Sequence, residues 1–263
     1  MIDLALACRL RLAALKLAWP GMEASLHDEH GHLASPGAGH PHLTSLFGQR
    51  YGSAGCDLGF TAPGAGAARR LYLALAYEPG VTLERVLRHR GVLALPRAMA
   101  VLQQVADALG HLHRRGIVHH DVRAANIVLR AGYTEPPHAV LIDLGAAEVP
   151  LAPRRWAIYG AEGHMPPERV APCPAPPTPA VDIYGMGMLL RALTARALVS
   201  PELARLIADA TMPDPADRLA ALPDMAALQA RLRCLPEAGQ GHPSPRRDGL
   251  EGWDRTRSRR STV

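Results

Sequence analysis

The strongest constraint on how this chain folds is the stretch from Gly116 to Leu129, which reads GIVHHDVRAANIVL. Two histidines, an aspartate, an arginine and an asparagine lie there between two short apolar runs. A β-rich core segment has no need of such side chains, and a buried charge requires a partner because leaving water is costly for it. The stretch therefore raises the hypothesis that Asp121 and Asn126 are held in place for chemistry.

The length and composition permit a sizeable core. A chain of 263 residues with 48% hydrophobic residues fits one large domain or two lobes. The net charge of +5 is mild, and much of the arginine surplus lies near the C-terminal end, so we expect no nucleic-acid partner. The four cysteines contain no CxxC pair, which argues against a zinc site and a disulfide framework and favours a reducing compartment.

The first residues, MIDLALACRLRLAALKLAW, are apolar but interrupted by charges. A signal peptide carries its charges before the apolar run, and a membrane-spanning helix needs about 20 predominantly apolar residues in succession. The segment has neither pattern, so we expect a cytoplasmic protein with no membrane partner.

The expected elements run from strands to helices along the chain. Strand-like patterns cover 4–18, 71–78, 127–129 and 139–145, and residues 40–51 read as a turn followed by a strand. Helical patterns cover 21–34, 82–90, 95–115, 181–196, 201–211 and 222–233, residues 52–70 read as a loop, and the chain from 236 reads as a disordered basic tail. This order predicts an α+β fold with a small β-rich lobe and a larger helical lobe.

Three polar residues of the opening stretch follow a fixed spacing. His119, Asp121 and Asn126 read H-x-D-x-x-x-x-N, and Asp143 follows at the end of an apolar strand. Mg²⁺ prefers oxygen ligands, which Asn126 and Asp143 offer, and a carboxylate such as Asp121 can accept a proton from a hydroxyl nucleophile. Taken alone, Asp121 could equally cap a turn.

In these residues the chain resembles the protein kinase family, whose catalytic loop reads H-R-D-L-x-x-x-N and whose metal motif reads D-F-G. Here the matching segments are HHDVRAAN and DLG. The resemblance implies that Asp121 is the catalytic aspartate and that Asn126 and Asp143 hold Mg²⁺ beside ATP. Arg123 stands where many members carry a phosphate-contacting lysine, and it keeps the charge but binds as a fork.

The resemblance extends over roughly residues 10–232. It implies a two-lobe kinase-like fold with the small lobe at 1–77, the large lobe at 78–235 and the tail at 236–263. Leu75 matches the gatekeeper, and Ala76 and Tyr77 match the backbone that contacts adenine. In the large lobe, Glu168 and Arg218 match an internal ion pair, and Asp182 matches the residue that braces the catalytic loop.

The small lobe matches the family less closely. LAALKLA resembles the strand that carries the phosphate-binding lysine, which implies that Lys16 and its neighbour Ala14 contact ATP. Glu29 is the expected helical partner of Lys16, and Glu23 is the alternative. Lys16 could instead simply extend into solvent, as a lone lysine on a strand often does. Only fifteen residues precede Lys16 and none is glycine, so the Gly-rich loop of the family lies upstream of this sequence or is lacking.

Two departures from the family concern regulation. Many members place an arginine before the catalytic aspartate to meet a phosphate on the activation loop, whereas this chain has His120. The loop AAEVPLAPRRWAIYGAEGH contains neither serine nor threonine, and Tyr159 is its only hydroxyl residue. We therefore predict that activity does not depend on phosphorylation of this loop.

A third departure concerns the substrate. Ala161 replaces a threonine that often contacts the catalytic aspartate in the family, which weakens the inference of a protein substrate.

A run of histidines, His27, His30, His32, His40 and His42, lies between the expected strand and the next segment. Imidazole is a common metal ligand, but the run has no fixed spacing, so a surface loop is the simpler interpretation.

The resemblance implies an ATP-dependent phosphotransferase that moves the γ-phosphoryl group to a serine or threonine hydroxyl of a protein substrate. The absence of a Gly-rich loop leaves an alternative open, a pseudokinase that binds nucleotide or a partner protein without catalysis. A small-molecule kinase of related fold is a third interpretation, which the Glu168 and Arg218 motifs oppose.

Overall fold

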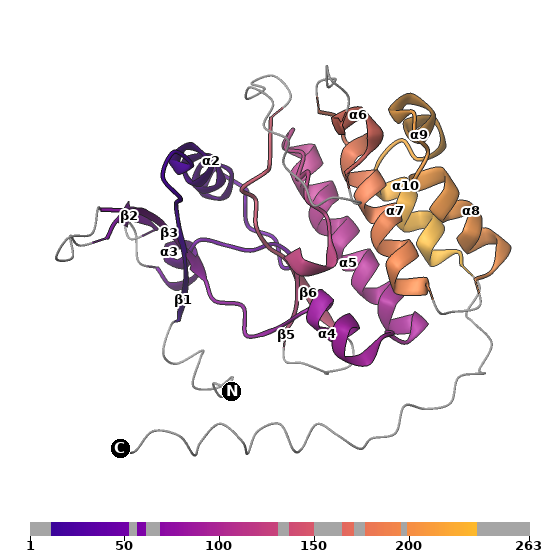
Figure 1. Cartoon of the computed structure of the whole chain (residues 1–263), viewed down its shortest axis with the longest axis horizontal. Coiled ribbons are helices and arrows are strands. Elements are labelled where there is room, and N and C mark those ends of the chain that lie inside the picture. Colours follow the sequence, from indigo (N-terminus) through magenta and orange to yellow (C-terminus); the bar gives the residue numbers. More distant parts are fainter. Residues whose placement is uncertain are drawn as a thin grey trace, which may run out of the picture.

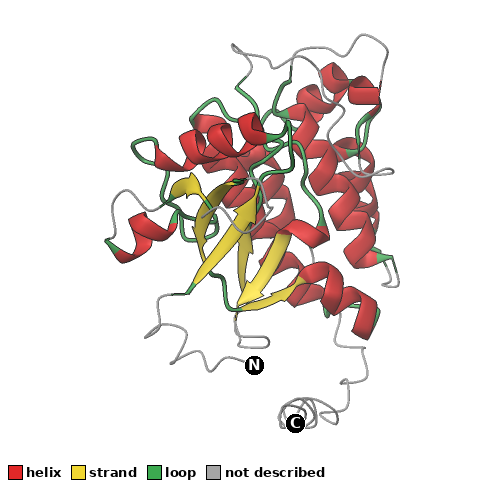
Figure 2. Cartoon of the chain, turned by 60° about the vertical axis from the view of Figure 1, so that its left-hand side comes forward, coloured by secondary structure: helices red, strands yellow, loops and turns green. Residues whose placement is uncertain are grey.

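The computed structural model of the chain describes residues 12–52, 57–61, 69–130, 137–149, 165–170, 177–195 and 199–235. A smaller part built around one antiparallel sheet carries the first helices, and a second sheet packs beside a helix bundle (Figure 1). Figure 2 shows the strands of both sheets gathered near one another with most of the helices beside them. This small sheet-based part followed by a mostly helical one agrees with the predicted α+β kinase-like fold, while the lobe boundary at residues 77 and 78 stays a prediction.

The first sheet has the order β1-β3-β2, with β3 in the centre and both neighbours antiparallel to it. Its register places Ala14 opposite Leu75 and Lys16 opposite Leu73, so these four side chains share one face of the sheet. The elements of this part are β1 (Ala13–Leu17), α2 (Glu23–Ala34), α3 (Phe47–Tyr51), β2 (Leu58–Phe60) and β3 (Leu71–Ala76).

The second sheet has the order β4-β5-β6 and is also antiparallel. Its elements and the helices around it are β4 (Gly80–Thr82), α4 (Leu83–Arg90), α5 (Leu95–Arg114), the 3₁₀ helix η1 (Ala124–Asn126), β5 (Ile127–Arg130), β6 (His138–Leu141), α6 (Pro167–Val170), α7 (Ala180–Thr194), α8 (Pro201–Ala210), α9 (Pro215–Ala221) and α10 (Met225–Arg233). Among the described residues, no helix is both long and apolar enough to cross a membrane.

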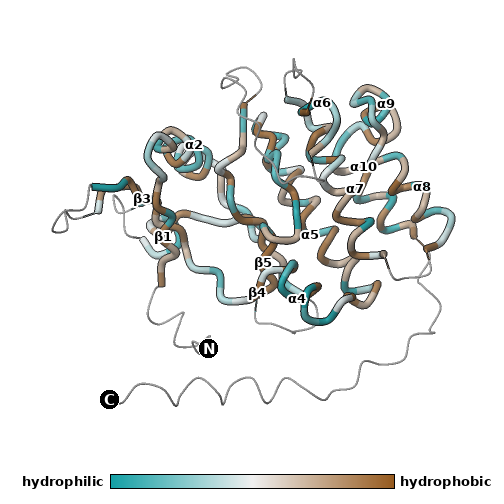
Figure 3. Tube along the Cα trace, viewed as in Figure 1, coloured by the Kyte–Doolittle hydropathy of each residue, from teal (hydrophilic) through white to brown (hydrophobic). Residues whose placement is uncertain are grey.

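Helix α5 is the central support of the large part. Residues spaced three or four apart form a stripe that is at most 1% exposed: Val101, Val105, Ala108, Leu109 and Leu112. Gly116 follows the helix with φ of +70°, a conformation that glycine adopts without strain. Helix α7, which packs against α5, is apolar over most of its surface (Figure 3) and lies in the core, as its sequence predicts.

Residues 42–46 join the two sheets. Thr44 N–H donates to Leu141 O at 2.9 Å in β6, and Ala76 N–H in β3 donates to Ser45 O at 2.9 Å. The sequence predicts a strand through residue 51, but the chain turns into α3 at Phe47. The helix ends at Tyr51 and is followed by Gly52, whose φ is +72°. Within the helix, Gly48 N–H donates to the carboxylate of Asp57, nine residues further along the chain. These non-local contacts override the local strand pattern.

The predicted loop over 52–70 also contains more structure than expected. Leu58 to Phe60 form β2, which pairs with β3 in the register Leu58↔Leu73 and Phe60↔Leu71. Gly59 allows the ring of Tyr72 to lie across β2, since a Cβ there would be 2.9 Å from the Tyr72 hydroxyl oxygen.

Four histidine rings lie in a row beside this junction. The ring centroids are 5.0 Å apart for His111 and His40, 5.8 Å for His40 and His42, and 4.9 Å for His42 and His138. Asp107 Oδ2 lies 3.3 Å from Nε2 of His40, the second ring of the row. The row therefore links α5, the segment that joins the sheets, and β6.

The histidine run is not a surface loop along its whole length, which corrects the prediction. His27, His30 and His32 lie on α2, and His32 Nε2 is 3.3 Å from Ala147 O. Within the described ranges, no three histidine, cysteine or acidic side chains are grouped so that they could hold a metal ion.

The histidine row makes stability depend on pH. Burial lowers the pKa of His40, His111 and His138 below 6.5, and the neighbouring Arg115 and Arg130 lower the pKa values of His111 and His138 further. Because the folded chain disfavours protonation of these rings, their contribution to the free energy of unfolding is complete above pH 6.5 and is lost as the pH falls below it. We expect the melting temperature to decrease over this acidic range.

Substitution of His40 and His111 by asparagine tests this dependence. The double variant is expected to show a shallower loss of melting temperature between pH 7 and pH 5, with His27→Asn as the control because His27 is exposed on α2. Parallel pH profiles for the double variant and the wild type would contradict the prediction.

Candidate active site

The loop between α5 and β5 presents the predicted catalytic aspartate. Asn126, on η1, donates from Nδ2 to both the backbone oxygen of Asp121 at 2.9 Å and its Oδ2 atom at 2.7 Å. Arg123 Nε donates to the same Oδ2 atom at 3.2 Å. The carboxylate of Asp121 is thus held by two donors on its own loop, and its side chain remains 18% exposed.

Asp182, on α7, binds the backbone of this loop through hydrogen bonds. Its two carboxylate oxygens accept the N–H groups of His119 and His120, each at 2.8 Å, and His113 Nε2 lies 2.8 Å from Oδ2. Burial works to raise the pKa of Asp182, but the His113 hydrogen bond and the nearby histidines outweigh burial and bring the pKa to about 2. The ionised carboxylate therefore fixes the turn at His120, whose φ of +69° is unfavourable for a side chain other than glycine.

Lys16 forms the predicted ion pair with Glu29 and not with its rival Glu23. Its Nζ atom lies 2.6 Å from Glu29 Oε2 and 2.6 Å from Asp143 Oδ1. Burial acts to lower the pKa of Lys16, but the two carboxylates raise it above 10.5, so the side chain is a cation at neutral pH. Burial also works against Asp143, yet Lys16 holds the pKa of that carboxyl below 3.8.

The glycine content of the segment after Met22 suggests a poor helix, but α2 forms over twelve residues. Tertiary contacts outweigh the low intrinsic propensity. Leu26 and Leu33 are buried, Ser25 Oγ donates to Gly145 O at 2.7 Å, and Glu29 Oε1 accepts the N–H of Leu144 at 3.0 Å. Helix α2 is thereby attached to the chain just after Asp143.

Asp143 lies close to Asn126 in space. Ile142 N–H donates to Asn126 O at 2.8 Å, which places the residue before Asp143 against the end of η1. Asp143 has a φ of +68°, and its Oδ1 atom accepts the N–H of Gly145 at 3.1 Å. The structure therefore brings together two groups, Asp121 with Asn126 and Lys16 with Glu29 and Asp143, through adjacent loops.

The residues predicted to contact adenine lie at the end of β3. Leu75 is 9% exposed and faces Ala14 across the strand pair. The N–H groups of Ala76 and Tyr77 already donate to Ser45 O at 2.9 Å and Leu12 O at 3.1 Å. The N–H groups of these two residues are therefore already used within the protein.

Glu78 is a residue that the sequence analysis did not single out. Its buried carboxylate is 2.8 Å from Arg50 Nη1 of α3 and also pairs with Arg130 of β5. One acid thus ties the first helices to the second sheet directly after β3. The sequence signal is an acidic residue between an apolar strand and the Pro79-Gly80 breaker.

The second predicted ion pair, Glu168 with Arg218, joins α6 to α9. Arg218 is fully buried, and its Nη1 and Nη2 atoms donate to Glu168 at 2.8 and 3.2 Å. The same guanidinium donates to Ala180 O at 2.7 Å and from Nη2 to Met212 O at 2.7 Å. This fully paired arginine fixes α6 against α7 and α9.

Tyr159 and Ala161, on which the predictions about regulation and substrate depend, lie outside the described residues. His120 does lie within them, and burial lowers its pKa to about 4. Its side chain is 2% exposed and neutral at pH 7, so it offers no charge to a phosphate.

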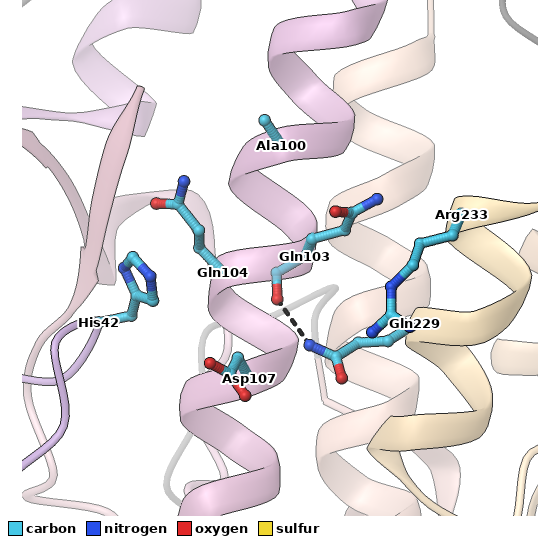
Figure 4. A pocket seen from close by; sticks show the side chains of 7 residues that line it. All are labelled: His42, Ala100, Gln103, Gln104, Asp107, Gln229 and Arg233. Carbon is cyan, nitrogen blue, oxygen red and sulfur yellow. Dashed lines mark hydrogen bonds between the residues drawn. The ribbon is translucent and has the colours of Figure 1, made fainter. Parts of the chain in front are cut away.

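A polar cavity of about 300 Å³ opens on the surface between α5 and α10 (Figure 4). Gln229 Nε2 donates to Gln103 O at 2.9 Å at its edge. None of the predicted site residues lines this cavity, whose walls are His42, Ala100, Gln103, Gln104, Asp107, Gln229 and Arg233. The cavity lies apart from the arrangement around Asp121, which is the candidate active site.

Comparison with known proteins gives an independent view of the same region. The family model described as "Protein kinase domain" matches residues 61–222, more than half of the chain. The chain is 36% identical over 123 residues to the serine/threonine-protein kinase PkaA of Streptomyces coelicolor. It is 37% identical over 125 residues to the serine/threonine-protein kinase PknG of Mycobacterium leprae, and 33% identical over 124 residues to PknE of Mycobacterium tuberculosis.

These matches cover 46%, 47% and 46% of this chain, respectively, but only 22%, 15% and 21% of the relatives. The chain therefore matches less than a quarter of the length of each of these three relatives.

Proposed function

The chain belongs to the protein kinase family, and we propose that it transfers the γ-phosphoryl group of ATP to a serine or threonine hydroxyl of a protein substrate. The observation that carries the proposal is the pairing of Lys16 with both Glu29 and Asp143, each at 2.6 Å, beside the loop in which Asn126 holds Asp121. A structural ion pair would not require this second, partly exposed acid, and the side chain of Asp143 is 44% exposed.

Each side chain has a role in the proposed transfer. Asp121 orients the substrate hydroxyl and takes its proton, because its Oδ2 atom is held by donors while the carboxylate remains accessible. Lys16, braced by Glu29, binds the α- and β-phosphates as a fixed cation. Arg123 neutralises charge that develops on the transferred group. Ala14, Leu75, Ala76 and Tyr77 surround the adenine ring.

Asn126 and Asp143 fit a bound Mg²⁺. Both offer oxygen ligands, and Asp143 Oδ1 is occupied by Lys16 and Gly145, which leaves its second oxygen for a cation. The Nδ2 atom of Asn126 faces Asp121, so its amide oxygen is the corresponding ligand. When bound, Mg²⁺ neutralises phosphate charge.

The proposal places the lobe boundary at residues 77–78 and the protein in the cytoplasm, with ATP, Mg²⁺ and a protein substrate as its partners. Neither a nucleic acid nor a membrane is required for this activity.

Asp143→Ala provides the test of this function. We expect wild-type protein to transfer labelled phosphate from Mg-ATP to a generic serine- and threonine-containing acceptor, and we expect the variant to lose at least about 10²-fold in rate because it removes a metal ligand and a partner of Lys16. Nucleotide affinity measured by calorimetry should fall in parallel.

Asp217→Asn is the control because Asp217 is exposed on α9. Equal transfer by the wild type and Asp143→Ala would contradict the proposal. Mg-ATP binding by the wild type without any transfer would instead establish the pseudokinase alternative.

A further inference from the structure

Glu148 forms a charged contact at the edge of the candidate active site. Residue 148 bridges to Val118, and both hydrogen bonds of the pair, Val118 N–H to Glu148 O and Glu148 N–H to Val118 O, measure 2.9 Å. Val118 lies three residues before Asp121 on the same loop. The backbone at Glu148 is therefore fixed to the segment that carries the catalytic aspartate.

The carboxylate of Glu148 lies between two basic side chains. Its Oε2 atom is 3.6 Å from Nε2 of His120 and 3.9 Å from Nη2 of Arg169. All three side chains are buried, at 2% exposure for Glu148, 2% for His120 and 5% for Arg169. The acid therefore contacts both the catalytic loop and α6.

Helix α6 is held on two sides by adjacent residues of opposite charge. Glu168 pairs with Arg218 of α9, while Arg169 reaches Glu148. Because Glu148 is also fixed to Val118, α6 is linked through one carboxylate to the loop that presents Asp121. Movement of α6 relative to Asp121 would separate these charges inside the protein.

This contact is a poor source of stability. Neither oxygen of the Glu148 carboxylate accepts a hydrogen bond from the described residues, and neither ring nitrogen of His120 has a hydrogen-bond partner among them. Burying a charge without hydrogen bonds costs more than a distant attraction returns. A buried carboxylate without hydrogen bonds calls for an explanation other than stability.

We propose that Glu148 is a positioning residue whose fixed negative charge holds α6 and Arg169 against the Asp121 loop, without the need for an added phosphate. The inference rests on the proposed function and names the element that maintains the geometry of its site. Because burial lowers the pKa of the neighbouring His120 and keeps its ring neutral, the attraction between charges at this contact is that between Glu148 and Arg169.

Glu148→Gln separates positioning from stability because it retains the shape of the side chain and removes its charge. We expect kcat for phosphoryl transfer to fall about ten- to a hundredfold with the KM for ATP unchanged, since Lys16 and Asp143 are untouched. The melting temperature is expected to stay equal to that of the wild type or to rise. A residue with a purely structural role would lower the melting temperature and would not change kcat selectively.

Hydrogen–deuterium exchange provides a readout that does not require activity. Glu148→Gln is expected to speed exchange of amides in 118–121 and 165–170 while the amides of α5 remain protected. Arg169→Gln should also speed exchange in these ranges, and the double variant should add little to the effect of Glu148→Gln on residues 118–121, because both changes remove the Glu148–Arg169 contact. Should Glu148→Gln fail to fold, Arg169→Gln carries the same test from the other partner.

Glu84→Gln is the matched control, since Glu84 forms an exposed ion pair with Arg88 on α4 at 3.0 Å. Unchanged kcat and unchanged exchange in Glu148→Gln would overturn the inference while leaving the proposed function intact. If wild type and Asp121→Asn transfer phosphate equally, the proposed function fails, and the exchange pattern alone then decides whether Glu148 ties α6 to the loop.

Discussion

Replacement of Asp121 by asparagine is expected to lower kcat for phosphoryl transfer by about 10²–10⁴-fold, the range typical of losing a general base. Asparagine has nearly the same shape and retains an oxygen that can accept from Asn126 Nδ2, which now lies 2.7 Å from the carboxylate. It cannot take the proton of a hydroxyl nucleophile. The loss should therefore appear in kcat, while the KM for ATP changes little because Lys16, Glu29 and Asp143 keep their contacts.

The measurement is steady-state transfer to a serine- and threonine-containing acceptor over a range of ATP concentrations, with the melting temperature determined in the same buffer. Asp217→Asn makes the same chemical change at an exposed position of α9 and should match the wild type. An Asp121→Asn variant with wild-type kcat would show that this carboxylate does not take part in the reaction, and the assignment of the site would fall with it.

The sequence was most informative where chemistry depends on local spacing. Asp121 and Asn126 are five residues apart on one loop, so the separation that allows the 2.7 Å contact is fixed by the short chain between them. The stripe on α5 was predictable for the same reason, because helical periodicity alone places Val101 and Val105 on one face. The Lys16 and Glu29 pair required the family resemblance, since 13 residues separate them and the local helix signal was weak.

The features that sequence reasoning missed depend on partners far along the chain. In the helix that begins at Phe47, Gly48 N–H donates to the carboxylate of Asp57. Strand β2 forms because it pairs with the edge of β3. Glu78 and Glu148 read in the sequence as ordinary loop acids, yet both are buried against arginines from other elements. No local pattern distinguishes a buried acid from an exposed one when its partner is decided by the fold.

Replacement of Arg218 by leucine is expected to lower the free energy of unfolding by about 3–5 kcal/mol, the usual effect of removing one partner of a buried ion pair. Arg218 is fully buried and donates to Glu168 as well as to the carbonyl oxygens of Ala180 and Met212. Leucine fills much of the volume but leaves the carboxylate and these oxygens without their donor. Urea unfolding followed by circular dichroism measures the change.

Arg88→Leu is the matched control, because Arg88 pairs with Glu84 on the surface of α4 with 67% of its own side chain exposed. Such exposed pairs contribute about 0–1 kcal/mol, so the control should unfold close to the wild type. A loss below about 1 kcal/mol in Arg218→Leu would mean that water or a rearranged side chain satisfies Glu168, and that the pair does not hold α6 in place.

The double variant Arg218→Leu with Glu168→Leu distinguishes the attraction within the pair from the penalty of an unpaired charge. Much of the single-variant loss comes from Glu168 left without a cation, so removal of both charges should restore part of the stability. Restoration remains incomplete because the oxygens of Ala180 and Met212 still lack a donor. If Arg218→Leu also lowers kcat and the double variant recovers stability but not kcat, the pair serves to fix α6 beside the catalytic loop, whereas recovery of both stability and kcat would assign the pair to folding alone.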